Sequence, residues 1–156
     1  MSERTQGEEL KEKLFNNKKN GWESVSEEEG RNIFNYCDGY MKFLNEAKTE
    51  REIVKRATEI AKENGYKEIS EYNTLKAGDK VYYINKGKNL FLAVIGEENI
   101  ENGINIVGSH ADSPRLDLKP NPVYEDHGFA YFKTHYYGGI KKYQWTAIPL
   151  SIHGVV

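Results

Sequence analysis

The sequence is short of cysteine and of long apolar runs. It has 156 residues and a single cysteine, Cys37, so an internal disulfide and a Cys-x-x-Cys zinc motif are both excluded. The longest apolar run, Leu90–Ile95, is far too short to cross a bilayer, and the first residues lack the apolar core of a secretory signal peptide. These absences predict a cytoplasmic protein with no membrane partner.

Positive charge is not in excess either. The chain carries 22 Lys and Arg residues against 24 Asp and Glu residues, which gives a formal net charge of -2. A nucleic-acid-binding protein needs a surplus of basic side chains to neutralise phosphates, so we expect no nucleic-acid partner. Aromatic residues make up 12% of the chain, which is typical of a folded sequence rather than a disordered one. The length allows one domain, or one domain and part of another.

Two capping boxes mark the beginnings of two helices. In this motif a Ser or Thr and a Glu three residues later each accept a hydrogen bond from a backbone N–H that the helix leaves unpaired. The two boxes are Ser26 with Glu29 and Thr49 with Glu52. Apolar residues at helical spacing follow each box and predict helices over residues 26–45 and 49–64. Cys37 falls on the apolar stripe of the first, which predicts that it is a small core residue.

The spacing of apolar residues changes to that of strands after residue 77. Runs rich in Val, Ile, Tyr and Phe alternate with turn-forming Asn and Gly residues. The expected strands are residues 80–84, 90–95, 104–107, 129–137 and 145–156. Helices followed by strands predict a mixed α/β domain.

A break in this pattern predicts a domain boundary. Neither proline of Pro120-Asn121-Pro122 can donate a hydrogen bond to a neighbouring strand, and the sequence beyond them is rich in strand-forming residues. We therefore expect one domain over residues 1–119 and a β-rich second domain over residues 120–156. The apolar, strand-like stretch Leu150–Val156 leads us to expect that more chain or a partner covers it.

The candidate site lies directly after the expected strand at residues 104–107. His110 can offer an imidazole nitrogen to a metal, and Asp112 can fix the tautomer of that ring by accepting its other proton. The carboxyl ends of strands are also where open α/β sheets bind their ligands. The competing interpretation is an ordinary His–Asp hydrogen bond that stabilises a loop.

Other residues give weaker indications. The remaining histidines match no compact zinc motif and are more typical of strand residues. They are His127, His135 and His153. No Asp or Glu follows Asp126, whereas a hydrolytic metal centre needs several ligands and a carboxylate base. We therefore expect that this chain does not assemble a complete two-metal site by itself.

The segment Ile106–Lys119 resembles the aspartyl aminopeptidase (aminopeptidase I) family of zinc metallopeptidases, and bacterial members most of all. Residues 47–52, 78–82 and 135–140 are similar to that family too, so the likeness covers most of the chain from about residue 22. The resemblance implies the N-terminal part of a mixed-sheet catalytic α/β domain, followed by the start of an inserted β-rich dimerisation domain.

The resemblance also implies an activity and a set of site residues. His110 corresponds to a zinc ligand, and Asp112 to the acid of the catalytic site that orients it. A complete subunit would hold two zinc ions, although one histidine is equally compatible with cobalt or manganese. The metal-activated water would hydrolyse N-terminal residues from peptides. The remaining ligands and the catalytic Glu belong to a longer C-terminal part of the family's domain, so this chain alone is expected to be inactive.

Two further interpretations concern partners. Family members are homo-oligomers, typically dodecamers built from dimers, and the resemblance implies the same here. The alternative function is a non-catalytic oligomerisation or interaction module that uses exposed β-strands. A nucleotide-binding α/β domain is a third hypothesis, but no glycine-rich loop supports it.

Overall fold

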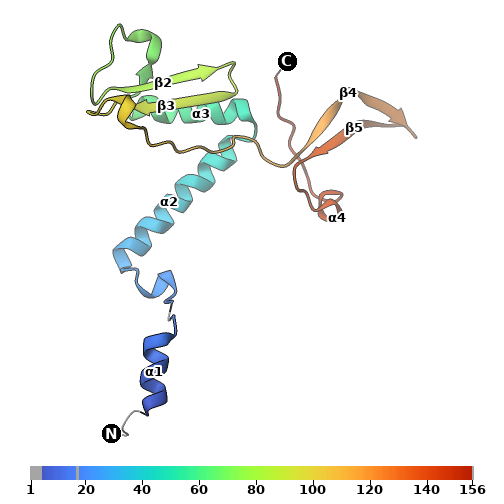
Figure 1. Cartoon of the computed structure of the whole chain (residues 1–156). Coiled ribbons are helices and arrows are strands. Elements are labelled where there is room, and N and C mark those ends of the chain that lie inside the picture. The colour runs from blue at the N-terminus through green and yellow to red at the C-terminus, as the bar shows by residue number, and fades with distance from the viewer. Residues whose placement is uncertain (1–4, 17, 156) are drawn as a thin grey trace. The chain divides into compact units, whose positions relative to one another are not determined.

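The computed structural model describes residues 5–16 and 18–155, and its chain divides into two units, Met1–Met41 and Lys42–Val156 (Figure 1). Helices come first and strands follow, so the predicted mixed α/β class is confirmed. The elements are α1 (Gln6–Leu14), the 3₁₀ helix η1 (Gly21–Glu23), α2 (Glu27–Glu46), α3 (Glu50–Glu63), β1 (Lys67–Glu68), η2 (Ile69–Glu71), β2 (Lys80–Asn85), β3 (Asn89–Val94), η3 (Ile100–Asn102), β4 (Arg115–Asp126), β5 (Phe129–Tyr137) and α4 (Lys142–Trp145). No helix within the described ranges combines the length and apolarity that a membrane span requires.

The first unit contains α1, η1 and most of α2. The capping box at the start of α2 is confirmed, because the Ser26 N–H donates to Glu29 Oε2 at 2.8 Å and the Glu29 N–H donates to Ser26 Oγ at 3.2 Å. The expectation that Cys37 is a core residue is wrong, since its side chain is exposed. None of the residues of α2 is buried, although the ring of Trp22 in η1 stacks on that of Phe34 with their centres 6.0 Å apart.

The core of the second unit lies between α3 and a three-stranded sheet. The strand order is β1-β2-β3, with β1 parallel to β2 and β2 antiparallel to β3. Helix α3 lies along the β2–β3 hairpin and packs against both strands (Figure 1). The buried residues are Ala47, Val54, Thr58, Ala61, Val81 and Tyr82. The hydroxyl of Thr58 donates to the Val54 carbonyl at 2.6 Å, so this buried polar group is paired.

The chain leaves the sheet through an irregular segment. Residues 103–114 form no helix or strand, so the predicted strand at 104–107 is wrong. A strand forms where its backbone groups pair with a neighbour, and no described strand pairs with this segment. Ile104 and Val107 are accordingly 62% and 100% exposed.

Strands β4 and β5 form an antiparallel hairpin. Its turn residues His127 and Gly128 have positive φ angles of 50° and 78°, as a tight hairpin turn requires. The strand register shifts between Leu118 and Val123, the stretch that holds the two prolines. The domain boundary expected between residues 119 and 120 falls inside β4 at this shift and stays a prediction.

The end of the chain differs from the sequence-based expectation. The predicted strand at 145–156 is wrong over the described residues, because α4 ends at Trp145 and residues 146–155 have no regular structure. Val156 lies outside the described residues. As with residues 104–107, no strand within the described part of the chain pairs with this stretch.

The packing of α3 on the sheet gives a stability prediction. Val54 is 4% exposed, so Val54→Ala removes two buried methyl groups and leaves a cavity. We expect the free energy of unfolding to fall by about 2 kcal/mol. The control is Val94→Ala on β3, because Val94 is 57% exposed and its loss changes the free energy by about 0.5 kcal/mol or less. Urea unfolding followed by circular dichroism measures both, and equal losses would contradict the proposed core.

Candidate functional site

His110 and Asp112 lie together on the irregular segment before β4. Nδ1 of His110 is 2.9 Å from the Asp112 carbonyl oxygen and 3.1 Å from Asp112 Oδ1. Both contacts involve Nδ1, and Nε2 has no partner among the residues that the structure describes. The His110 side chain is 82% exposed, whereas that of Asp112 is 33% exposed. An imidazole with one nitrogen held by oxygen and the other free and accessible is the arrangement of a metal-ligating histidine.

The hydroxyl of Tyr137 completes the set of contacts around Asp112. It donates to Asp112 Oδ2 at 2.7 Å, across 25 positions of sequence. This hydrogen bond is the main cause that lowers the pKa of Asp112, and it is also the main cause that raises the pKa of Tyr137, because ionisation of the phenol would break it. Asp112 is therefore held as a carboxylate between a histidine on its own loop and a tyrosine at the end of β5.

Arg115 links this group to α3. Its guanidinium lies 4.2 Å from the centre of the Tyr137 ring, and its Nη1 is 3.3 Å from Glu50 Oε1 in the first turn of α3. Its Nε donates to Asp117 Oδ1 at 2.7 Å, which is the main cause that raises the pKa of Arg115. The base of the hairpin is thus tied to the α/β core beside the His110 loop.

A second polar group lies at the same turn of α3. His153 Nδ1 is 2.8 Å from Glu52 Oε1, and His153 Nε2 is 2.8 Å from the hydroxyl of Ser151. The other carboxylate oxygen of Glu52 accepts hydrogen bonds from the Thr49 N–H, as the predicted capping box requires, and from the Lys48 N–H, both at 2.9 Å. The bond to His153 is the largest cause that lowers the pKa of Glu52 to about 2.

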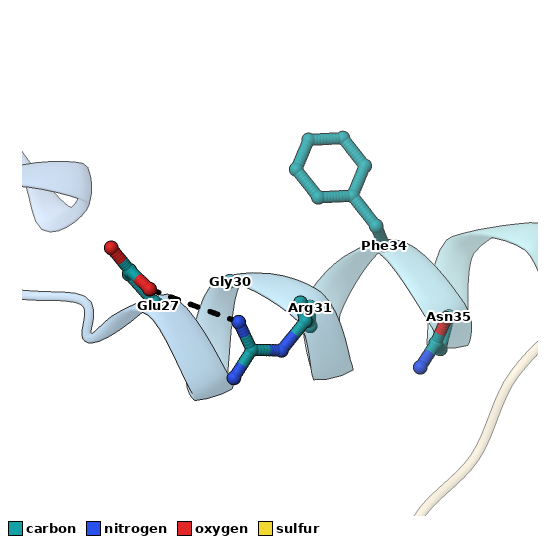
Figure 2. A pocket seen from close by; sticks show the side chains of 5 residues that line it. All are labelled: Glu27, Gly30, Arg31, Phe34 and Asn35. Atoms are coloured by element: carbon teal, nitrogen blue, oxygen red, sulfur yellow. Dashed lines mark ion pairs between the residues drawn. The ribbon is translucent and has the colours of Figure 1, made fainter.

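The remaining two histidines have neighbours of their own. His127 pairs with Asp126 in the hairpin turn, and His135 stacks on Tyr136. A surface hollow on α2 is lined by Glu27, Gly30, Arg31, Phe34 and Asn35 (Figure 2). Its polar side chains include a Glu27–Arg31 ion pair at 3.9 Å on the exposed helix surface, and it contains no histidine.

The groups around His110 are suited to supply one ligand to a zinc ion. Within residues 5–16 and 18–155, no three His, Cys, Asp or Glu side chains come close enough to share a metal ion. His110 Nε2 is suited to bind zinc as a neutral imidazole, with Asp112 holding the opposite nitrogen. The roles given to His110 and Asp112 stay predictions.

Sequence reasoning missed three residues of these groups, namely Glu50, Glu52 as a histidine partner, and Tyr137. The pairing of Arg115 with Tyr137 is set by the register of β4 and β5, which the sequence alone does not fix. The sequence did contain one local indication of Tyr137. Successive side chains of a strand face opposite sides, so one residue of the Tyr136-Tyr137 pair is expected to face the His110 loop.

Comparisons with known proteins agree on one family. The family model described as aminopeptidase I zinc metalloprotease (M18) matches residues 43–156. A probable M18 family aminopeptidase 1 from Borrelia garinii subsp. bavariensis is 50% identical over 139 residues, covering 89% of this chain and 30% of the relative. The protein of the same name from Clostridium acetobutylicum is 46% identical over 147 residues, covering 92% of this chain and 32% of the relative.

Solved structures give the same result. Aminopeptidase I from Borrelia burgdorferi B31 matches with a TM-score of 0.78 and 45% identity, over 81% of this chain and 31% of the other. An M18 family aminopeptidase from Thermotoga maritima matches with a TM-score of 0.77 and 41% identity, over 86% of this chain and 29% of the other. The chain therefore spans about 30% of the length of the relatives that it matches.

The Glu52–His153 contact predicts a dependence of stability on pH. A carboxyl whose pKa is lower in the folded state contributes stability above its unfolded pKa, here near 4.5, and that contribution is lost as the pH falls towards about 2. Glu52→Gln should therefore reduce the free energy of unfolding at about pH 6 and lose its effect at about pH 2. Urea unfolding over this range measures the difference, with Glu97→Gln on an exposed loop as the control. A gap between wild type and Glu52→Gln that stays constant with pH would contradict the proposed contact.

Proposed function

Because the chain belongs to the aminopeptidase I zinc metalloprotease (M18) family, we propose that it forms part of a metal-dependent aminopeptidase that releases N-terminal residues from peptides. The observation that carries the proposal is the His110–Asp112 contact inside the matched region, with Nε2 of His110 exposed and free of partners among the described residues. The chain spans about 30% of its relatives, so the activity belongs to the larger protein that contains these residues.

Each residue of the pair has a separate role in this proposal. His110 would hold one zinc through Nε2, because Asp112 occupies Nδ1 and so keeps the lone pair of Nε2 directed outwards. Asp112 would orient that imidazole and strengthen it as a ligand. A zinc ion held there would supply Lewis-acid chemistry, namely polarisation of a peptide carbonyl and a lower pKa of a bound water. The resemblance to the family supports two such ions in a complete subunit, and a lone imidazole is also compatible with cobalt or manganese.

The proposal includes the source of the remaining groups. A hydrolytic metal centre needs more ligands and a carboxylate base than the described residues bring to His110. We expect these groups to come from the part of the family's length that this chain does not span, and the chain by itself to lack peptidase activity.

Assembly and location form part of the same proposal. We propose that the complete protein is a homo-oligomer of dimers, and that residues from about 120 onwards begin the dimerisation domain. The exposed apolar side chains of the hairpin support this, since Val123, Phe129 and Phe132 are 65%, 65% and 51% exposed. A cytoplasmic location agrees with the single cysteine.

The function is tested by completing the chain. Residues 1–156 replace the corresponding segment of the Clostridium acetobutylicum relative, which is 46% identical to them. This chimera should hydrolyse aminoacyl-p-nitroanilides with added zinc, and His110→Ala should lower kcat by more than about 100-fold and remove one of the two zinc ions. His127→Ala, in the hairpin turn, is the matched control. Full activity and full zinc content in His110→Ala would contradict the proposal, and a folded, oligomeric but inactive chimera would favour the non-catalytic module.

The chain alone gives a second measurement. Zinc is titrated into the ¹⁵N-labelled protein, and the four histidine rings are followed by NMR. Nε2 of His110 should respond at a lower zinc concentration than the nitrogens of His135, because the His110 ring is exposed and oriented by a carboxylate, whereas His135 stacks on Tyr136. An equal response of His110 and His135 would count against a metal role for His110.

A further inference from the structure

Asp112 is held from two sides although it lies on an irregular loop. Its Oδ1 is 3.1 Å from His110 Nδ1, and its Oδ2 accepts a hydrogen bond from Tyr137 at 2.7 Å. An aspartate side chain on such a loop can rotate about χ1 and χ2, and every rotation changes which oxygen faces the histidine. The second contact restricts this rotation, because it fixes the oxygen that the histidine does not use.

We propose that Tyr137 is a positioning residue of the metal site. Its hydroxyl fixes the carboxylate of Asp112, and Asp112 in turn holds Nδ1 of His110 so that Nε2 faces outwards as the ligand. The inference rests on the function proposed above and adds a residue to it. Tyr137 acts through Asp112 and does not itself bind zinc or substrate.

Tyr137 can do this because it is itself held in place. The Arg115 guanidinium lies against its ring at 4.2 Å, and Arg115 is fixed by Asp117 at 2.7 Å and by Glu50 at 3.3 Å. The tyrosine is also the last residue of β5, directly opposite Arg115, the first residue of β4. Its hydroxyl is thus presented by a paired strand end and not by a mobile loop.

The next residue brings the strand end close to the loop. Gly138 has a φ of 75°, and a Cβ built on it would lie 3.3 Å from the Cα of Pro114. A larger residue here would meet both a strained backbone and a crowded neighbour. The close approach of Gly138 to Pro114 keeps Tyr137 within reach of Asp112.

The neighbouring tyrosine is a matched control. Tyr136 is 46% exposed and Tyr137 is 41% exposed, and each ring lies 4.2 Å from a cationic group, Lys142 or Arg115. The hydroxyl of Tyr136, however, bonds to no side chain or backbone group in the described part of the chain. Replacing either residue by Phe keeps the ring and its cation contact, so only Tyr137→Phe removes a hydroxyl that touches Asp112.

The first test measures the tautomer of His110 in the chain as it stands. In the neutral form of the ring, the ¹⁵N shifts should show the proton on Nδ1. In Tyr137→Phe we expect these shifts to move towards those of a mixture of both tautomers, and Tyr136→Phe should match wild type. Unchanged His110 shifts in Tyr137→Phe, or the same change in both variants, would overturn the inference.

A third variant separates this inference from the proposed function. Asp112→Ala should weaken the preference of His110 for the Nδ1–H tautomer, because only the backbone carbonyl of residue 112, 2.9 Å from Nδ1, is then left to accept from the ring. If it does and Tyr137→Phe does not, the function stands and the role of Tyr137 falls. If Asp112→Ala also leaves the shifts unchanged, the Asp112 carboxylate does not orient the ring and both proposals fail.

The second test uses the zinc-loaded chimera. Tyr137→Phe should weaken zinc binding by about 10- to 100-fold, measured by competition with a chelator, while KM stays unchanged. If Tyr137 acts through Asp112, adding Tyr137→Phe to Asp112→Ala should change zinc affinity by less than about 2-fold. Losses that multiply in the double variant would overturn the inference and leave the function standing, whereas zinc content unaffected by His110→Ala would refute the function and with it the metal-site role of Tyr137.

Discussion

The arrangement of the site depends on the first turn of α3. Glu50 in this turn pairs with Arg115 at the start of the hairpin, and Glu52 accepts a hydrogen bond from His153 in the segment that follows it. Two carboxylates within one helical turn therefore hold both ends of the stretch from Arg115 to His153. The turn can serve as an anchor because its own backbone is fixed by the capping box of Thr49 and Glu52 and by the packing of α3 on the sheet.

The contacts that join the hairpin to α3 are weak when taken singly. Arg115 and Glu50 are each 30% exposed, and partly exposed ion pairs contribute about 1 kcal/mol or less. These contacts stabilise one another because they share one guanidinium, which contacts Glu50, Asp117 and the ring of Tyr137 at once. The site therefore depends on a network whose members hold one another in position, more than on burial.

Local patterns predicted most of the fold. Both capping boxes and both long helices follow from spacings of three and four residues, and the His110–Asp112 contact spans only two. The predictions that failed depend on a partner from elsewhere in the chain. Strands at 104–107 and 145–156 need a neighbour to pair with, and burial of Cys37 needs an element packed on α2. An apolar pattern indicates which face can be buried, but it does not supply what covers that face.

The hydrogen bond between Tyr137 and Asp112, which the sequence did not predict, depends on the stretch with the two prolines. Near the turn, Asp126 pairs with Phe129, and continuing that register down the hairpin would place Ile140 opposite Arg115. The register shift between Leu118 and Val123 places Tyr137 there instead. Ile140 has no hydroxyl to donate, so without the shift the Oδ2 atom of Asp112 would lose its partner. The stretch Pro120-Asn121-Pro122, which the sequence marks as a break between domains, thus also sets the register that brings a tyrosine to Asp112.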